Sequence, residues 1–120
     1  MKYRLWIIVW LTLYPLLCGF DIYNLPLQAA LEWSSAIEAE WNHLQASIPP
    51  TQRNADYWYL YGNLKYSIFA SKKGFTNFIQ GRLTAALPAC DGLYADDPAA
   101  AEDCRRRLKG LMPEEFFKGR

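Results

Sequence analysis

Cysteine and histidine are the residues best suited to covalent, redox or metal chemistry, and this chain has few of them. Its 120 residues include three cysteines, Cys18, Cys90 and Cys104, and one histidine, His43. There is no Cys-x-x-Cys pair and only one histidine, so the ligand spacing typical of structural zinc sites is missing. We therefore predict neither a metal site nor a cofactor.

No nucleophile and base stand in a recognisable catalytic context. His43 lies in an amphipathic stretch, which favours a surface or capping role. The serines lack the Gly-x-Ser-x-Gly setting of a hydrolase nucleophile. A two-carboxylate glycosidase needs paired acids in a cleft, whereas Glu32, Glu38 and Glu40 are expected on a solvated helix face. We predict no catalytic residue and a protein that is not an enzyme.

The N-terminus predicts export. Lys2 and Arg4 precede an uncharged apolar run over residues 5–20, which is the layout of a signal peptide. No Lys or Arg follows this run until Arg53. Because positive residues stay on the cytoplasmic side, the rest of the chain should be translocated. We expect an extracytoplasmic protein, most consistent with the bacterial periplasm.

The fate of the apolar run stays open. Residues 5–20 are short for the ~30 Å hydrocarbon core of a bilayer, which favours a cleaved signal ending near Gly19. An uncleaved segment would instead anchor the protein in the inner membrane, and Cys18 leaves a lipoprotein site as a third alternative. We divide the chain into a signal peptide or signal anchor, 1–20, and a helical extracytoplasmic domain, 21–120.

Two cysteines remain once Cys18 is set aside with the export segment. An even pair in an oxidising compartment indicates a disulfide between Cys90 and Cys104. The alternative is two free buried thiols.

The rest of the chain has helical periodicity, and no strand pattern competes with it. The expected helices run over about 25–48, 54–71, 75–87 and 98–111, with one last turn at 114–117. Their end signals are an N-cap at Asn24, Pro49-Pro50, an N-cap at Asn54 or Asp56, Gly74, Pro88, Asp97-Pro98 and Met112-Pro113. The fold class is therefore all-α: an export or anchor helix followed by a small three- to four-helix antiparallel bundle with one disulfide.

Each expected helix has an apolar stripe that we assign to the core. In chain order the stripes are Leu27, Ala30, Ser34, Ile37, Trp41, Leu44 and Ile48; Tyr57, Leu60, Tyr61, Leu64 and Ile68; Phe75, Phe78, Ile79, Leu83 and Ala86; and Ala101, Cys104, Leu108 and Leu111.

The second helix has a further apolar stripe on another side, formed by Trp58, Tyr66 and Phe69. An all-round apolar helix is usually central in a bundle, but in so small a protein one side is also available for a partner. We select Trp58, Tyr59, Tyr66 and Phe69 as the predicted partner contacts, because aromatic side chains supply binding energy.

Charge is unevenly distributed. Residues 21–52 contain acids but no Lys or Arg, whereas Arg105, Arg106, Arg107 and Lys109 make the last long helix basic. Apposing the first and last helices would pair these charges, although the basic run also suits an anionic surface. Without Lys2 and Arg4, 11 of the 13 cations remain against 12 acids, which does not suit a nucleic-acid binder.

Two family resemblances involve the expected second and third helices. Trp58-Tyr59-Leu60-Tyr61-Gly62-Asn63 with Tyr66, followed by Phe78, Gly81 and Pro88, resembles one tetratricopeptide hairpin. There is no second copy, and Pro88 falls two residues late. The spacing Tyr61, Leu64, Ile68, Gly74-Phe75, Phe78-Ile79 resembles a small exported family of integrative conjugative elements, but that family's terminal Arg-Ala-Gln-Pro-Arg-Asp motif is missing.

These features predict an interaction or accessory component of an envelope assembly, such as a secretion or conjugation apparatus, with another envelope protein as partner. The alternative is a small periplasmic inhibitor or immunity protein that blocks a toxin or hydrolase. It would use the acidic first helix or the acidic loop containing Asp91, Asp96 and Asp97.

Overall fold

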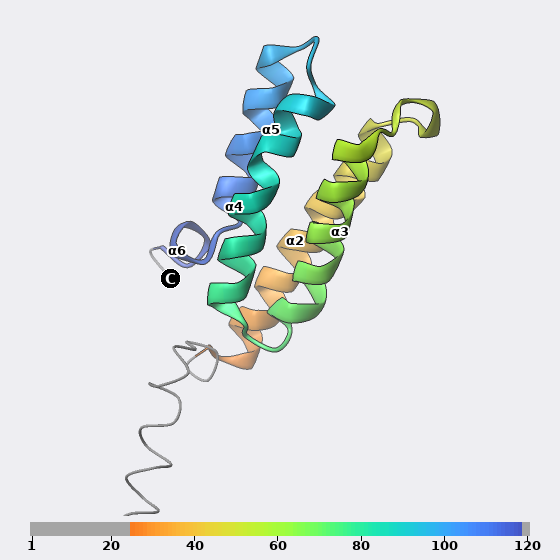
Figure 1. Ribbon diagram of the computed structural model, residues 1–120. Coiled ribbons are helices and arrows are strands. Elements are labelled where there is room, and N and C mark those ends of the chain that lie inside the picture. The colour runs from red at the N-terminus through yellow and green to blue at the C-terminus, as the bar shows by residue number, and fades with distance from the viewer. Residues whose placement is uncertain (1–24, 119–120) are drawn as a thin grey trace, which may run out of the picture.

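The computed structural model describes residues 25–118, which form helices and connecting turns without a strand (Figure 1). The helices are α2, Leu27–Ser47; the short 3-10 helix η2, Pro50–Gln52; α3, Ala55–Ser71; α4, Thr76–Leu93; α5, Pro98–Gly110; and α6, Pro113–Phe116. The all-α prediction is confirmed for this part of the chain. The predicted export helix lies outside the described residues.

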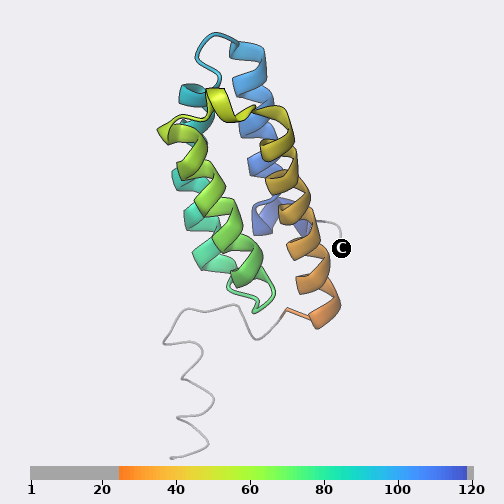
Figure 2. The same ribbon diagram turned by 90° about the vertical axis from the view of Figure 1, so that its right-hand side faces the viewer.

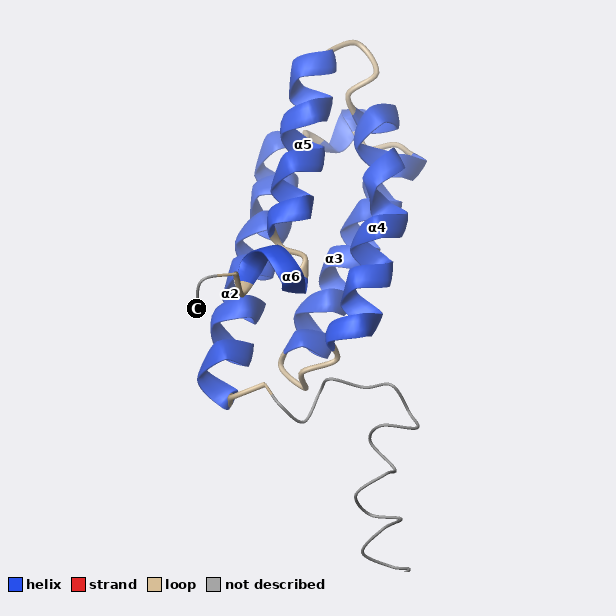
Figure 3. Ribbon diagram, turned by 90° about the vertical axis from the view of Figure 1, so that its left-hand side faces the viewer, coloured by secondary structure: helices blue, strands red, loops and turns tan. Residues whose placement is uncertain are grey.

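The four long helices form an up-and-down bundle. Each of α2, α3, α4 and α5 packs against the next in chain order, as short connections between antiparallel helices require. Figure 2 shows that α5 returns beside α2, which closes the bundle. The short α6 packs against α4 and α5, and Figure 3 shows it beside the lower half of the bundle.

Local capping chemistry accounts for several helix ends. The Asn54 side chain accepts a hydrogen bond from the Tyr57 backbone N–H at the start of α3, and Asp97 accepts one from Ala100 at the start of α5. Gly74 ends the α3 region with a φ of 75°, in the left-handed conformation that glycine adopts most readily. These three predicted signals are confirmed.

The predicted start of the first helix, with an N-cap at Asn24, is wrong by two residues, because α2 begins at Leu27. The position before α2 is occupied by Pro26, which makes no side-chain capping bond, and Asn24 is not described.

The predicted end of the third helix at Pro88 is wrong. Helix α4 continues through Pro88 to Leu93, so the expected acidic loop begins later than residue 91. A proline inside a helix costs about 3 kcal/mol, because it removes a backbone donor and crowds the preceding turn. Ala89 and Cys90, which follow, are both buried, and their packing offsets this cost.

The core differs from the predicted stripes at its edges. Leu27 was assigned to the core but is 72% exposed, whereas Trp33, outside the predicted stripe, is fully buried. The Trp33 indole Nε1 donates a 2.7 Å hydrogen bond to the Leu111 carbonyl at the end of α5, and its ring contacts Phe117 edge-on. Trp33 of α2 therefore contacts the C-terminal part of the bundle.

Candidate functional site

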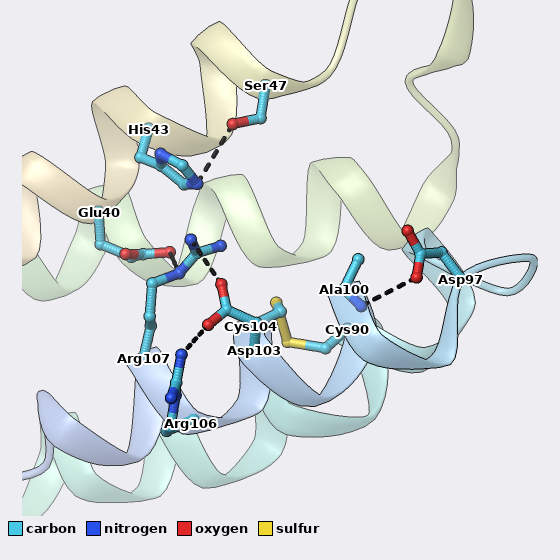
Figure 4. A network of polar contacts seen from close by, with 10 residues as sticks. All are labelled: Glu40, His43, Ser47, Cys90, Asp97, Ala100, Asp103, Cys104, Arg106 and Arg107. Carbon is cyan, nitrogen blue, oxygen red and sulfur yellow. Dashed lines mark hydrogen bonds and ion pairs between the residues drawn. A yellow bond between two sulfur atoms is a disulfide. The ribbon is translucent and has the colours of Figure 1, made fainter.

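The two cysteines of the folded domain lie at disulfide-bonding distance. Cys90 near the end of α4 and Cys104 in the middle of α5 are both buried, and their Cα atoms are 5.7 Å apart (Figure 4). This spacing is within the range of disulfide bonds. The confirmed proximity gives these residues a structural role in joining α4 to α5.

A network of charged side chains links α2 to α5 (Figure 4). Arg107 lies between Glu40, with Nε 3.2 Å from the carboxylate, and Asp103, with a terminal nitrogen at 3.0 Å. Arg106 pairs with the other oxygen of Asp103, and Arg105 pairs with Asp91 of α4. The three arginines of the basic run are thus all paired within the bundle.

Glu40 does not lie on the solvated helix face that was predicted for it. Its side chain is only 13% exposed because it faces α5, whereas Glu32 and Glu38 are exposed. Burial raises the pKa of the Glu40 carboxyl above its ordinary value, and the opposing attraction of Arg107 is the smaller effect. Burial likewise raises the pKa of Tyr94, which faces the same network. The arrangement fits a structural link between helices.

His43 and Ser47 form a hydrogen-bonded pair on the exposed side of α2, with 3.2 Å between Nε2 and Oγ (Figure 4). A catalytic pair of this kind normally has a third group that orients the base. The nearby Glu40 instead pairs with Arg107. The geometry suits a surface contact between residues four apart on a helix.

An exposed aromatic surface lies on α3 and continues onto α4. We define this aromatic face by Trp58, Tyr59, Tyr66 and Phe69 of α3 with Phe78 of α4; these side chains are 52%, 47%, 49%, 60% and 39% exposed. The α3 members follow helical spacing and so share one side of the helix. The Tyr66 and Phe78 rings, 5.3 Å apart, join the two helices. All four predicted contact residues are therefore at the surface and on one face.

Cations accompany the aromatic rings. The Arg82 guanidinium lies over both Tyr66 and Phe78, at 4.8 and 4.9 Å from their centroids, and the Lys73 ammonium lies 4.5 Å from the centroid of Phe69. Residues 57–90 contain four cations, the two above with Lys65 and Lys72, and no Asp or Glu. Among residues 25–118, none of these four forms an ion pair.

A shallow groove of about 430 Å³ runs between α3 and α4 along this face. Its lining consists of Tyr59, Asn63, Asn77, Phe78, Gly81, Arg82 and Ala85. Gly81 in the groove and Gly62 on the outer side of α3 are both exposed, and a Cβ added at either would meet nothing within 4 Å.

Sequence reasoning missed the contribution of α4 to this surface. Phe78 was assigned to the core, and Arg82 and Gly81 were given no role at a surface. The unbroken absence of acids over 57–90, interleaved with aromatic residues, is the sequence signal that marks the region. Periodicity alone does not reveal it, because the exposure of Phe78 depends on how α3 and α4 are set against each other.

Two of the acids predicted for the acidic loop have structural roles, and one of them, Asp91, lies in α4 and not in the loop. Asp91 pairs with Arg105, and the Asp97 side chain caps α5. Two of the three acids considered for an inhibitory surface are therefore engaged within the bundle.

No protein-family model, curated protein or solved structure shows significant similarity to this chain. The resemblances to a tetratricopeptide hairpin and to an exported family of conjugative elements consequently rest on the quoted motifs alone. Within residues 25–118, no helix is both long enough and apolar enough to cross a membrane. The same residues contain no group of three or more His, Cys, Asp or Glu placed to hold a metal ion.

Proposed function

We propose that this chain is a small, non-enzymatic helical envelope protein that acts as an interaction or accessory component of an envelope assembly, of the secretion or conjugation type. Another envelope protein docks on the aromatic face of α3 and α4. The bundle serves as a rigid support that presents this face.

The distribution of exposed apolar side chains carries the proposal. Among the described residues, seven large hydrophobic side chains are exposed, and five of them form the aromatic face. The other two, Leu27 and Leu31, lie on α2. A contiguous exposed apolar patch on a small domain is typical of a binding surface. Aromatic residues are also enriched among those that contribute most of the binding energy at interfaces.

The proposed location rests on two features. The basic and apolar layout of residues 1–20 is that of an export segment, which also leaves membrane anchorage open. The proximity of Cys90 and Cys104 suits an oxidising compartment such as the bacterial periplasm.

The alternative, a periplasmic inhibitor or immunity protein, would use acidic residues as its contact surface. It is the less favoured candidate because Asp91 and Asp97 already serve the bundle, while the side chains of the aromatic face remain exposed. Replacing Asp91, Asp96 and Asp97 together with neutral residues should therefore reduce stability more than partner association.

Replacing Trp58 with Ala tests the proposal. Because the side chain is 52% exposed, Trp58→Ala should leave helicity nearly unchanged while capture of the envelope partner weakens. The assay is crosslinking in intact envelopes followed by affinity capture of the full chain, with circular dichroism of the purified variant. Undiminished capture by a folded Trp58→Ala variant would overturn the proposal.

A further inference from the structure

We infer that the groove between α3 and α4 accepts an acidic, amphipathic helix of the partner protein. This inference rests on the proposed function and adds the chemistry and shape of the docked segment. Its supports are the two exposed glycines, the cations that form no ion pair within residues 25–118, and the form of the groove.

The glycines are the first support. Gly62 and Gly81 lie in the interiors of α3 and α4, where glycine is less favourable than alanine because it loses more backbone freedom. A Cβ at either position would meet nothing within 4 Å, so no contact inside the bundle requires glycine. Bare backbone on a helix surface does, however, let a second helix approach closely.

The cations are the second support. Lys65, Lys73 and Arg82 each lie over an aromatic ring of α3 or α4, at 5.9, 4.5 and 4.8 Å from a centroid, and have no carboxylate partner among residues 25–118. The arginines of α5 provide the contrast, because Arg105 and Arg107 both have acidic partners within the bundle. A partner helix with a row of apolar side chains flanked by Asp or Glu would contact the aromatic rings and form ion pairs with these cations at the same time.

The form of the groove favours a helix over a bilayer surface. Tyr59 and Phe78 are among its lining residues, and Gly81 lies in the same groove. A row of apolar side chains on a helix can enter such a groove, as in other helix-in-groove complexes. A flat lipid surface would touch the exposed aromatic rings and leave the glycine backbone uncovered.

Photocrosslinking in cells that produce the full chain tests the inference. Benzoylphenylalanine is placed singly at Phe69, at one end of the aromatic face, and at Phe78, in the groove, and crosslinked peptides are sequenced by mass spectrometry. We expect both positions to give the same partner protein. The peptide captured from Phe78 should be an Asp- and Glu-rich segment with apolar residues at helical spacing.

Two variants examine the groove with the crosslinker at Phe69. Gly81→Leu should raise the Tm by about 4 °C, since leucine is the better helix former, yet lower the crosslink yield about tenfold by filling the groove. Arg82→Glu should also lower the yield about tenfold. The matched controls, Gly110→Leu and Lys109→Glu on α5, should leave the yield unchanged.

The outcomes separate the inference from the function that it refines. If neither Phe69 nor Phe78 captures a protein, the proposed docking function fails and the inference fails with it. If Phe69 captures a partner in unchanged yield from Gly81→Leu and Arg82→Glu, docking stands and the groove inference is overturned. Capture of lipid, of a second copy of this chain, or of a basic or extended segment also overturns it.

Discussion

Breaking the bond predicted between Cys90 and Cys104 should lower the free energy of unfolding by about 3 kcal/mol. The cysteines are 14 residues apart, and closing a loop of this length removes roughly 10 cal/mol/K of entropy from the unfolded chain. A domain of this size unfolds with an entropy of roughly 200 cal/mol/K, so the Tm should fall by about 15 °C.

The assay is urea unfolding followed by circular dichroism, with and without a reductant. Reduction should lower the urea concentration at the midpoint. It should also increase the m-value, which is the slope of the unfolding free energy against urea, because the unfolded chain becomes more expanded. The double variant Cys90→Ala/Cys104→Ala is the control: it should start near the reduced stability and not respond to the reductant. Two free thiols by non-reducing mass analysis of the exported protein, or an unchanged midpoint on reduction, would refute the reasoning.

Three further predictions concern the links between helices. Trp33→Phe should lower the free energy of unfolding by about 1–3 kcal/mol in a urea titration, because it leaves the Leu111 carbonyl without its buried donor. A loss below about 0.5 kcal/mol, the size of an ordinary surface substitution, would show that the hydrogen bond from Trp33 to Leu111 is dispensable. Burial raises the folded-state pKa of Glu40, so its contribution to the free energy of unfolding is full below its unfolded pKa and declines as the pH rises through the folded pKa. Glu40→Gln should flatten this pH dependence of the free energy of unfolding. The same pH dependence in wild type and variant would exclude Glu40 as its source. Asp97→Ala should lower the free energy of unfolding by about 1 kcal/mol through loss of the α5 cap, whereas Asp97→Asn should retain most of the stability that the cap contributes. Equal losses in the two variants would show that the charge of Asp97 matters and not its capping hydrogen bond.

Signals confined to a few neighbouring residues were readable from the sequence. The caps at Asn54 and Asp97 and the left-handed Gly74 depend on groups within three or four positions, so their residue types suffice to predict them. The helical periods likewise gave the class of fold. Pairing Cys90 with Cys104 needed only the exclusion of Cys18.

Features set by packing between helices were not readable in the same way. Pro88 stays inside α4 because the residues after it are buried against the bundle, a gain that a local breaker signal does not contain. Trp33 is buried by the returning end of α5, and Glu40 by the same helix. In each case the deciding partner is far away in the sequence, so periodicity along one helix misplaces the residue.

The aromatic face was predictable in part from spacing along one helix, and the rest of it depends on packing between two helices. Helical spacing separated Trp58, Tyr66 and Phe69 from the core stripe of the same helix, which sufficed to propose them as contacts. Phe78 and Arg82 join them only through the setting of α4 against α3. A surface shared by two helices becomes apparent only when both are placed.

Hydroxyl-radical footprinting of the protein in its native envelope tests the docking claim most directly. The oxidation of Trp58, Tyr66 and Phe69 is compared between intact envelopes and purified protein, with the exposed Leu31 of α2 as the internal control. If a partner docks on the aromatic face, these three side chains should be protected severalfold in envelopes while Leu31 is not. Equal oxidation of the three in both samples would contradict the account.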